Sequence, residues 1–282
     1  MGERLGITKT YKLYIGGKFP RTESGRTTVV TDASDNATAH VCHASRKDVR
    51  DAVEAATKAQ SSWASQTAYL RGQVLYRLAE MMEGKASELA AALGDGGEHE
   101  VAQAIDRTVH FAGWTDKFSM IAGGANPVAG PYHNFTIPGA IGVTGVVCPD
   151  NPSLLGLISL VAPVVAMGNA CVVIASETNP IPSMVLAEAL ATSDLPGGGV
   201  NILTGFRDEL CPHLAEHRGV IAIHAGGLSE EQRTTLRLGA ANNMKRVTVR
   251  DGVNYADDDA CEGPRWLEPF VEFKTVWHPS AV

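Results

Sequence analysis

A nearly continuous apolar stretch lies between Gly139 and Glu177, and its pattern predicts a strand, a buried helix and a second strand. Residues 141–148 form a β-branched run of strand length, which the prolines at 149 and 152 end. Residues 154–167 are apolar on nearly every side, as in a core helix, and fall short of the about 20 residues that a bilayer span needs. Residues 170–174 are the next strand. A buried helix between two apolar strands predicts a βαβ unit with parallel strands.

The alternation of helical and strand patterns continues to residue 250. It predicts helices at 183–192, 209–216 and 229–241, and strands at 200–203, 220–224 and 246–250. Five strands alternating with helices indicate an α/β fold with a doubly wound, Rossmann-like parallel sheet.

The residues before this sheet predict a hairpin and several helices. Residues 11–19 carry a Gly-Gly turn at 16–17, and short strands at 27–30 and 38–41 flank a polar turn at 32–36. Helical spacing of apolar residues predicts helices at 45–63, 70–93 and 100–118.

Two segments outside the sheet have hairpin and strand patterns. Residues 120–138 read as a hairpin with an extended arm, and the tail from 263 to 282 contains one more strand. In that strand Val271, Phe273, Thr275 and Trp277 fall on one face. A lone aromatic strand must pair with another sheet, because an unpaired strand edge promotes aggregation.

Composition narrows the function classes. A net charge of −7 without basic clusters argues against a nucleic-acid partner, and no basic amphipathic helix indicates a membrane surface. The first thirteen residues have no apolar core of signal-peptide length. Five single cysteines without a C-x-x-C pair predict a reduced cytoplasmic protein with neither a disulfide framework nor a metal site.

Seven motifs in order give the chain a family resemblance. They are YIGGK at 14–18, FAGWTDK at 111–117, PDNP at 149–152, ACVVIASE at 170–177, LPGGGVNILTG at 195–205, KRVT at 245–248 and FKTVW at 273–277. The chain resembles the NAD(P)-dependent aldehyde dehydrogenase superfamily. The resemblance implies a cofactor-type domain at 1–119 and 139–262. It also implies that the hairpin at 120–138 and the strand within 263–282 form a small antiparallel oligomerisation sheet.

The departures from this family concern catalysis first. The family's catalytic domain, with its cysteine nucleophile in a G-Q-x-C setting, would follow the strand at 246–250, but the family's C-terminal strand follows instead within about thirty residues. The family's general-base glutamate is matched by Arg250, which cannot accept a proton. Asn151 matches the oxyanion-hole asparagine, yet no nucleophile accompanies it. We therefore expect no catalytic residues.

The cofactor site is similarly reduced. The resemblance leaves Pro149, Asn151, Ser176, Glu177 and Gly226 as vestigial cofactor-binding residues. The lysine that contacts the adenosine ribose in the family is replaced by Ile174. The glycine that opens the phosphate-binding helix is replaced by Glu230, which places a negative charge where an anion would bind. We expect no cofactor to bind with useful affinity, and NAD(P) if any.

Two other residues were weighed as catalytic groups. Cys261 lies in an acidic run that raises a thiol pKa, which favours an inert loop cysteine over a nucleophile. His224 ends a strand, where doubly wound folds bind ligands, but no carboxylate partner can be assigned and a structural role is favoured.

The sequence thus predicts a non-catalytic aldehyde-dehydrogenase-like subunit that assembles with a full-length aldehyde dehydrogenase. Its expected interface residues are Tyr132, Phe135, Ile137, Val271, Phe273 and Trp277. Two alternatives stay open: a reduced dehydrogenase that still uses NAD(P), and a homo-oligomeric nucleotide-binding module.

Overall fold

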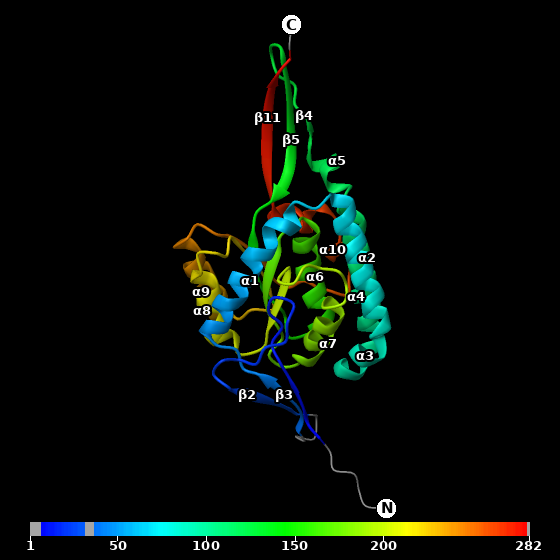
Figure 1. The fold of residues 1–282 in the computed structure, drawn as a ribbon, viewed down its shortest axis with the longest axis vertical. Coiled ribbons are helices and arrows are strands. Elements are labelled where there is room, and N and C mark those ends of the chain that lie inside the picture. The colour runs from blue at the N-terminus through cyan, green and yellow to red at the C-terminus, as the bar shows by residue number, and fades with distance from the viewer. Residues whose placement is uncertain (1–6, 32–36, 281–282) are drawn as a thin grey trace, which may run out of the picture.

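A five-stranded parallel sheet forms the centre of the computed structural model, which describes residues 7–31 and 37–280 (Figure 1). The strands are β6 (Val143–Val147), β7 (Ala170–Ile174), β8 (Val200–Leu203), β9 (Ala222–Gly226) and β10 (Arg246–Arg250). They lie in the order β10-β9-β6-β7-β8. The chain therefore starts in the middle, builds one half and then crosses to the other side, so the strand order reverses between β6 and β9. The predicted doubly wound α/β fold is confirmed.

Helices cover both faces of this sheet (Figure 1). One face carries α1 (Arg46–Ala64), α8 (Arg207–Glu216) and α9 (Glu230–Ala241). The other carries α2 (Ala68–Gly84), α4 (Gly97–Trp114), α6 (Ser153–Ala166) and α7 (Ile181–Leu190). Every residue of α6 is buried, as its all-round apolar sequence predicts. Within the described residues, no helix combines the length and apolarity that a membrane crossing requires.

Helix boundaries differ from the prediction at one place in particular. The single helix expected at 70–93 is two helices, because the backbone leaves the helical conformation at Lys85 before α3 (Ala86–Leu93) begins. The Lys85 ammonium donates to Glu188 of α7 (2.7 Å) and to Glu88 (3.1 Å). This break turns α3 back toward α7. A short helix α5 (Phe118–Ala122) extends into the segment that was expected to be loop.

The N-terminal strands form a sheet of their own in the order β1-β3-β2. They are β1 (Lys9–Tyr11), β2 (Thr27–Thr31) and β3 (Ala37–Cys42). The predicted Gly-Gly hairpin is present but minimal: Ile15 and Lys18 exchange two backbone hydrogen bonds, and Gly16 and Gly17 have φ values of 61° and 76°. The polar turn at 32–36 lies outside the described residues.

A long antiparallel ribbon projects from one end of the body (Figure 1). It consists of β4 (Gly124–Ala125), β5 (Tyr132–Ala140) and β11 (Val271–Pro279), in the order β11-β5-β4, and we call these three strands the arm. The register runs from Val271 opposite Ala140 to Pro279 opposite Tyr132. The predicted pairing of the tail with the 120–138 segment is therefore confirmed.

The register divides the expected interface residues between the two faces of the arm. Directly opposite residues share a face, so Tyr132 lies with Phe273 and Trp277, and its ring centroid is 5.7 Å from that of Trp277. Phe135 and Ile137 lie on the other face. Val271 was expected at the interface, but it is only 3% exposed and belongs to the core. The expected boundary at 263 also moves, because Trp266, Leu267 and Phe270 pack into the body.

A buried asparagine fastens the arm to the body. Asn169 is fully buried at the end of α6, and its Oδ1 accepts the N–H groups of Ile141 (2.7 Å) and Gly142 (3.0 Å). Its Nδ2 donates to the carbonyls of Val164 (3.2 Å) and Phe270 (2.8 Å). One side chain thus joins the chain leaving β5 to the residue that precedes β11.

We expect Asn169→Leu to lower the free energy of unfolding by about 3 kcal/mol, because it leaves buried backbone groups without hydrogen-bond partners. Urea unfolding of the full chain measures this difference. Asn242→Ala, at an exposed position after α9, is the control and should change the value by less than about 0.5 kcal/mol. Equal losses for both variants would contradict the role assigned to Asn169.

Candidate functional site

The candidate site lies at the carboxyl ends of β6 and β9, where the strand order reverses. Doubly wound folds bind ligands in the crevice at this position. The residues matched to the cofactor site gather around it: Pro149 and Asn151 follow β6, Ser176 and Glu177 follow β7, and Gly226 ends β9. The structure therefore brings together the five positions that the sequence singled out.

An arginine that the sequence analysis did not identify fills one side of this crevice. Arg207, the first residue of α8, is 3% exposed and forms a two-pronged ion pair with Asp150 at 2.8 and 2.9 Å. It also donates to the carbonyls of Cys148 (2.7 Å) and Gly227 (3.4 Å). Its guanidinium thus bridges the ends of β6 and β9.

The acid of this ion pair is held in its charged form. Burial alone would raise the pKa of Asp150, but Arg207 and the amides of Glu177 and Thr178 together lower it below its ordinary value. The Asp150–Arg207 pair is therefore a fixed structural element at the pH of the cell.

The two residues matched to the ribose contact are used inside the protein. The Ser176 hydroxyl bonds to Asp150 Oδ1 (3.1 Å) and accepts the N–H of Asn179 (3.0 Å). A Glu177 carboxylate oxygen accepts the backbone N–H of Arg207. Both side chains are thus hydrogen-bonded within the protein.

A tyrosine covers the end of β9. Tyr255 is 4% exposed, and a Cβ added to Gly226 would lie 2.0 Å from its hydroxyl oxygen. The hydroxyl has no hydrogen-bond partner among the described residues, and burial raises its pKa well above the ordinary value. The space directly above the end of β9 is thus occupied by the protein itself.

Arg107 of α4 holds this tyrosine's segment in place. Its guanidinium, which is fully buried, donates to Ser159 (2.6 Å), to the Tyr255 carbonyl (3.1 Å) and to the carboxylates of Asp258 (2.6 Å) and Glu262 (3.3 Å). We call residues 251–262 the acidic segment. Three of its residues bind one buried cation, and this holds the segment against the carboxyl end of β9.

The residue at the general-base position has a structural role. The Arg250 guanidinium lies 4.0 Å from the centre of the Trp266 ring, and its Nε donates to Nε2 of His224 (3.1 Å). His224 is fully buried and its Nδ1 bonds to the Leu160 carbonyl (2.9 Å). Burial and the neighbouring Arg250 lower the pKa of His224 to about 3, so the imidazole is neutral. The structural role expected for His224 is confirmed.

Cys261 differs from its expected setting. It was interpreted as a loop cysteine, but it ends the short helix α10 (Asp258–Cys261) and is fully buried, with its thiol donating to the Asn254 carbonyl (3.4 Å). Its pKa is raised, as predicted, although burial contributes more than the acidic neighbours. All five cysteines are free and buried, and the described residues contain no group of three His, Cys, Asp or Glu placed to hold a metal ion.

Arg107, Arg207 and Tyr255 were missed because each acts through partners that are distant in sequence. A signal was available for Arg107: it is a cation on the apolar side of a predicted helix, where a buried partner is needed. For Arg207 and Tyr255 no local pattern marks the burial.

Comparison with known proteins places this geometry in context. The sequence profile of the aldehyde dehydrogenase family matches residues 19–256. The mitochondrial benzaldehyde dehydrogenase of Antirrhinum majus is 32% identical over 252 residues, which is 86% of this chain and 47% of that protein. The cytosolic 10-formyltetrahydrofolate dehydrogenase of Mus musculus is 32% identical over 89% of this chain and 29% of its own length.

Solved structures agree with the sequence relatives. The NAD+ complex of an aldehyde dehydrogenase from Bacillus cereus is 26% identical, with a TM-score of 0.80 over 86% of this chain and 51% of that one. The chain thus spans about half the length of this structure and of the Antirrhinum relative. The profile match ends before the tail strand, so the resemblance of residues 273–277 to the family stays a prediction.

The neutral His224 predicts a pH dependence of stability. Its folded pKa of about 3 lies below the ordinary value of 6.5, so unfolding takes up a proton between these pH values and stability falls as the pH drops through this range. One such group contributes up to about 1.4 kcal/mol per pH unit. We expect His224→Gln to make the free energy of unfolding less steep between about pH 6.5 and pH 4.5.

Urea unfolding at several pH values measures this slope. His99→Gln, at an exposed position on α4, serves as the control and should keep the wild-type slope. If the His224 variant also keeps that slope, this histidine does not titrate on unfolding and the assigned environment is wrong.

Proposed function

Because the chain belongs to the aldehyde dehydrogenase family, we propose that it is a non-catalytic subunit that assembles with a complete aldehyde dehydrogenase and supports or regulates it. One observation carries this proposal: β10 ends at Arg250, and β11 begins at Val271. A catalytic domain of about 100 residues or more does not fit into this connection. Residues 251–270 instead pack against the chain's own sheet through Tyr255, Trp266 and Phe270.

The remaining groups supply no catalytic set. Arg250 stays protonated and is committed to Trp266 and His224, so it cannot act as a base. Every cysteine is buried, and burial raises the pKa of Cys148 to about 12, far from the thiolate that a nucleophile requires. Asn151 is exposed at the rim. We therefore propose that the isolated chain does not oxidise aldehydes.

The side chains around the crevice are the reason for proposing that the chain binds NAD(P) only weakly. Tyr255 and Arg207 line the crevice, and Ile174 is buried where the family has a ribose-binding lysine. Glu230 is the first residue of α9, so its carboxylate lies beside the helix N-terminus that would face a phosphate. NAD is bound in the Bacillus cereus structure, and for this chain we propose that NAD(P) binds at most weakly.

We expect NAD and NADP at about 1 mM to leave the thermal unfolding of the chain unchanged, and aldehyde oxidation to stay at background. A site with a dissociation constant near 10 µM would stabilise the protein by about 2.7 kcal/mol at this concentration. Such a stabilisation by either cofactor would contradict the proposal and favour the reduced-dehydrogenase alternative.

A double variant tests whether Tyr255 and Glu230 are the cause of the weak cofactor binding. Tyr255→Ala with Glu230→Gly empties the space over Gly226 and removes the opposing charge, so NAD should bind this variant more tightly than the wild-type chain. Equal binding to both proteins, measured by calorimetry, would show that these two side chains do not limit the affinity.

The arm supports assembly with another subunit. Phe273 (42%), Trp277 (58%) and Tyr132 (46%) are exposed on one face, and Ile137 (46%) and Val276 (37%) on the other. β11 is an edge strand, and β4 covers only two residues of β5. A thin sheet with apolar residues on both faces requires further packing. We propose that a full-length aldehyde dehydrogenase provides this cover, in the cytoplasm, where the five free cysteines stay reduced.

We expect Phe273→Asp with Trp277→Asp to release the chain from the dehydrogenase that co-purifies with it, or to make it insoluble. Truncation after Val271 should do the same without touching the buried Phe270 and Val271. Leu238→Asp, which adds a charge at an exposed position of α9, is the control and should keep the complex.

Size-exclusion chromatography with light scattering and mass spectrometry identifies what elutes with the tagged chain. A variant that stays folded and still co-elutes with the dehydrogenase would show that the arm is not the assembly element. A wild-type chain that elutes as a homo-oligomer alone would favour the nucleotide-binding alternative.

A further inference from the structure

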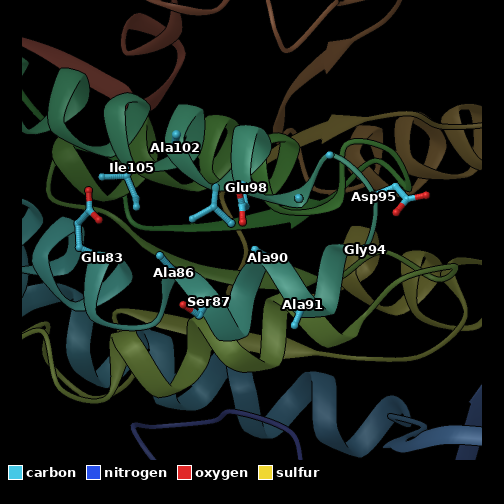
Figure 2. Close-up of a pocket in the computed structure, with 13 residues that line it drawn as sticks. Glu83, Ala86, Ser87, Ala90, Ala91, Gly94, Asp95, Glu98, Ala102 and Ile105 are labelled. Carbon is cyan, nitrogen blue, oxygen red and sulfur yellow. The ribbon is translucent and has the colours of Figure 1, made fainter.

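A groove between α3 and α4 shares no lining residue with the crevice or the arm. Its volume is about 720 Å³, which is within the range of about 300–1,000 Å³ typical of ligand sites. Figure 2 shows α3 along one side and α4 along the other, with Ala86 and Ala90 facing Ile105 and Ala102. The lining is therefore built mainly from small apolar side chains.

The charged groups around this groove are all negative. Glu83 lies at one end, Asp95 at the other and Glu98 between them (Figure 2). No Lys, Arg or His lines the groove, and none of these three carboxylates forms a salt bridge within the part of the chain that the structure describes. The neighbouring acids Glu80 and Glu88 are paired, with Arg77 (2.7 Å) and Lys85 (3.1 Å). The groove is thus lined by three carboxylates that have no cationic partner among the described residues.

The shape of the groove favours a helix as its occupant. The two helices are in close contact at one end, where a Cβ on Gly97 would lie 2.5 Å from the Ala90 carbonyl oxygen. Small residues along the rest of the lining allow a third helix to approach closely. Strand addition is excluded because the backbone groups of both walls are paired within their own helices.

We propose that this groove binds a basic amphipathic helix of a partner protein. Apolar side chains spaced at i, i+3 or i+4, and i+7 would enter between α3 and α4, and flanking Lys or Arg would pair with Glu83, Glu98 and Asp95. Figure 1 shows α3 at the end of α2 that points away from the arm. This surface therefore binds independently of the arm, and the inference does not rest on the proposed function.

A display selection on the full-length chain tests the proposal. The probe is a library of helical peptides of about 14 residues with randomised surface positions, selected on the wild-type chain. We expect the selected peptides to be enriched in Lys and Arg around an apolar stripe. Their affinity should fall at least about tenfold for Glu83→Gln with Glu98→Gln, because two charge pairs are lost. Ala102→Trp, at an exposed position, should block binding by filling the groove.

Asp116→Asn with Asp259→Asn is the matched control, because it removes the same charge from exposed positions outside the groove. Peptides should bind this variant as they bind the wild-type chain, and a scrambled peptide of equal charge should not bind. The proposal is overturned if no peptide is selected, if the selected peptides lack basic residues, or if both charge variants weaken binding equally.

Discussion

The buried guanidinium of Arg107 fixes the position of the acidic segment, residues 251–262, which covers the carboxyl end of β9. A fully buried cation requires anionic and carbonyl partners, and Asp258, Glu262 and the Tyr255 carbonyl provide them. These contacts fix the conformation of the acidic segment. Tyr255 then covers the end of β9, and the following residues lead Trp266 and Phe270 into the core. The position of Tyr255 over β9 and the path of the chain toward the arm both depend on this interaction.

The side chains at the carboxyl ends of β6, β7 and β9 bond mainly to one another. Asp150 and Arg207 form an ion pair beside the ends of β6 and β9. Ser176 and Glu177 turn toward this pair, and Tyr255 covers the end of β9. Each contact ties a side chain at the carboxyl ends of the strands to another part of the protein. Under the proposed function, the contacts that stabilise this region of the fold are also the ones that weaken cofactor binding.

Continuous apolar runs near proline and glycine were enough to predict four strands of the sheet, β6 to β9, because strands covered on both faces have this composition. β10 has the alternating sequence RVTVR and is only partly buried. The aromatic pattern of β11 showed that this strand needs a partner, and the family resemblance indicated the 120–138 segment as that partner. The position of the site could be predicted from the sequence, but the ion pairs around it could not. Arg207 and Asp150 are 57 positions apart, and Arg107 and Asp258 are 151 apart, so no local sequence period connects the partners. Cys261 was misplaced for a related reason, since its acidic neighbours suggest exposure while the Trp266 indole, donating to the Ala260 carbonyl, holds the turn inward.

The pairing of β5 with β11 has a consequence for synthesis. β5 is translated before the whole parallel sheet and β11 after it, so the arm requires the longest loop closure between two paired strands in the described sheets. Until β11 emerges, β5 has β4 as its short partner, and most of its edge is open. Any subunit that recognises the completed arm therefore recognises a chain whose sheet has already been made. Assembly through the arm would therefore exclude chains that end before β11.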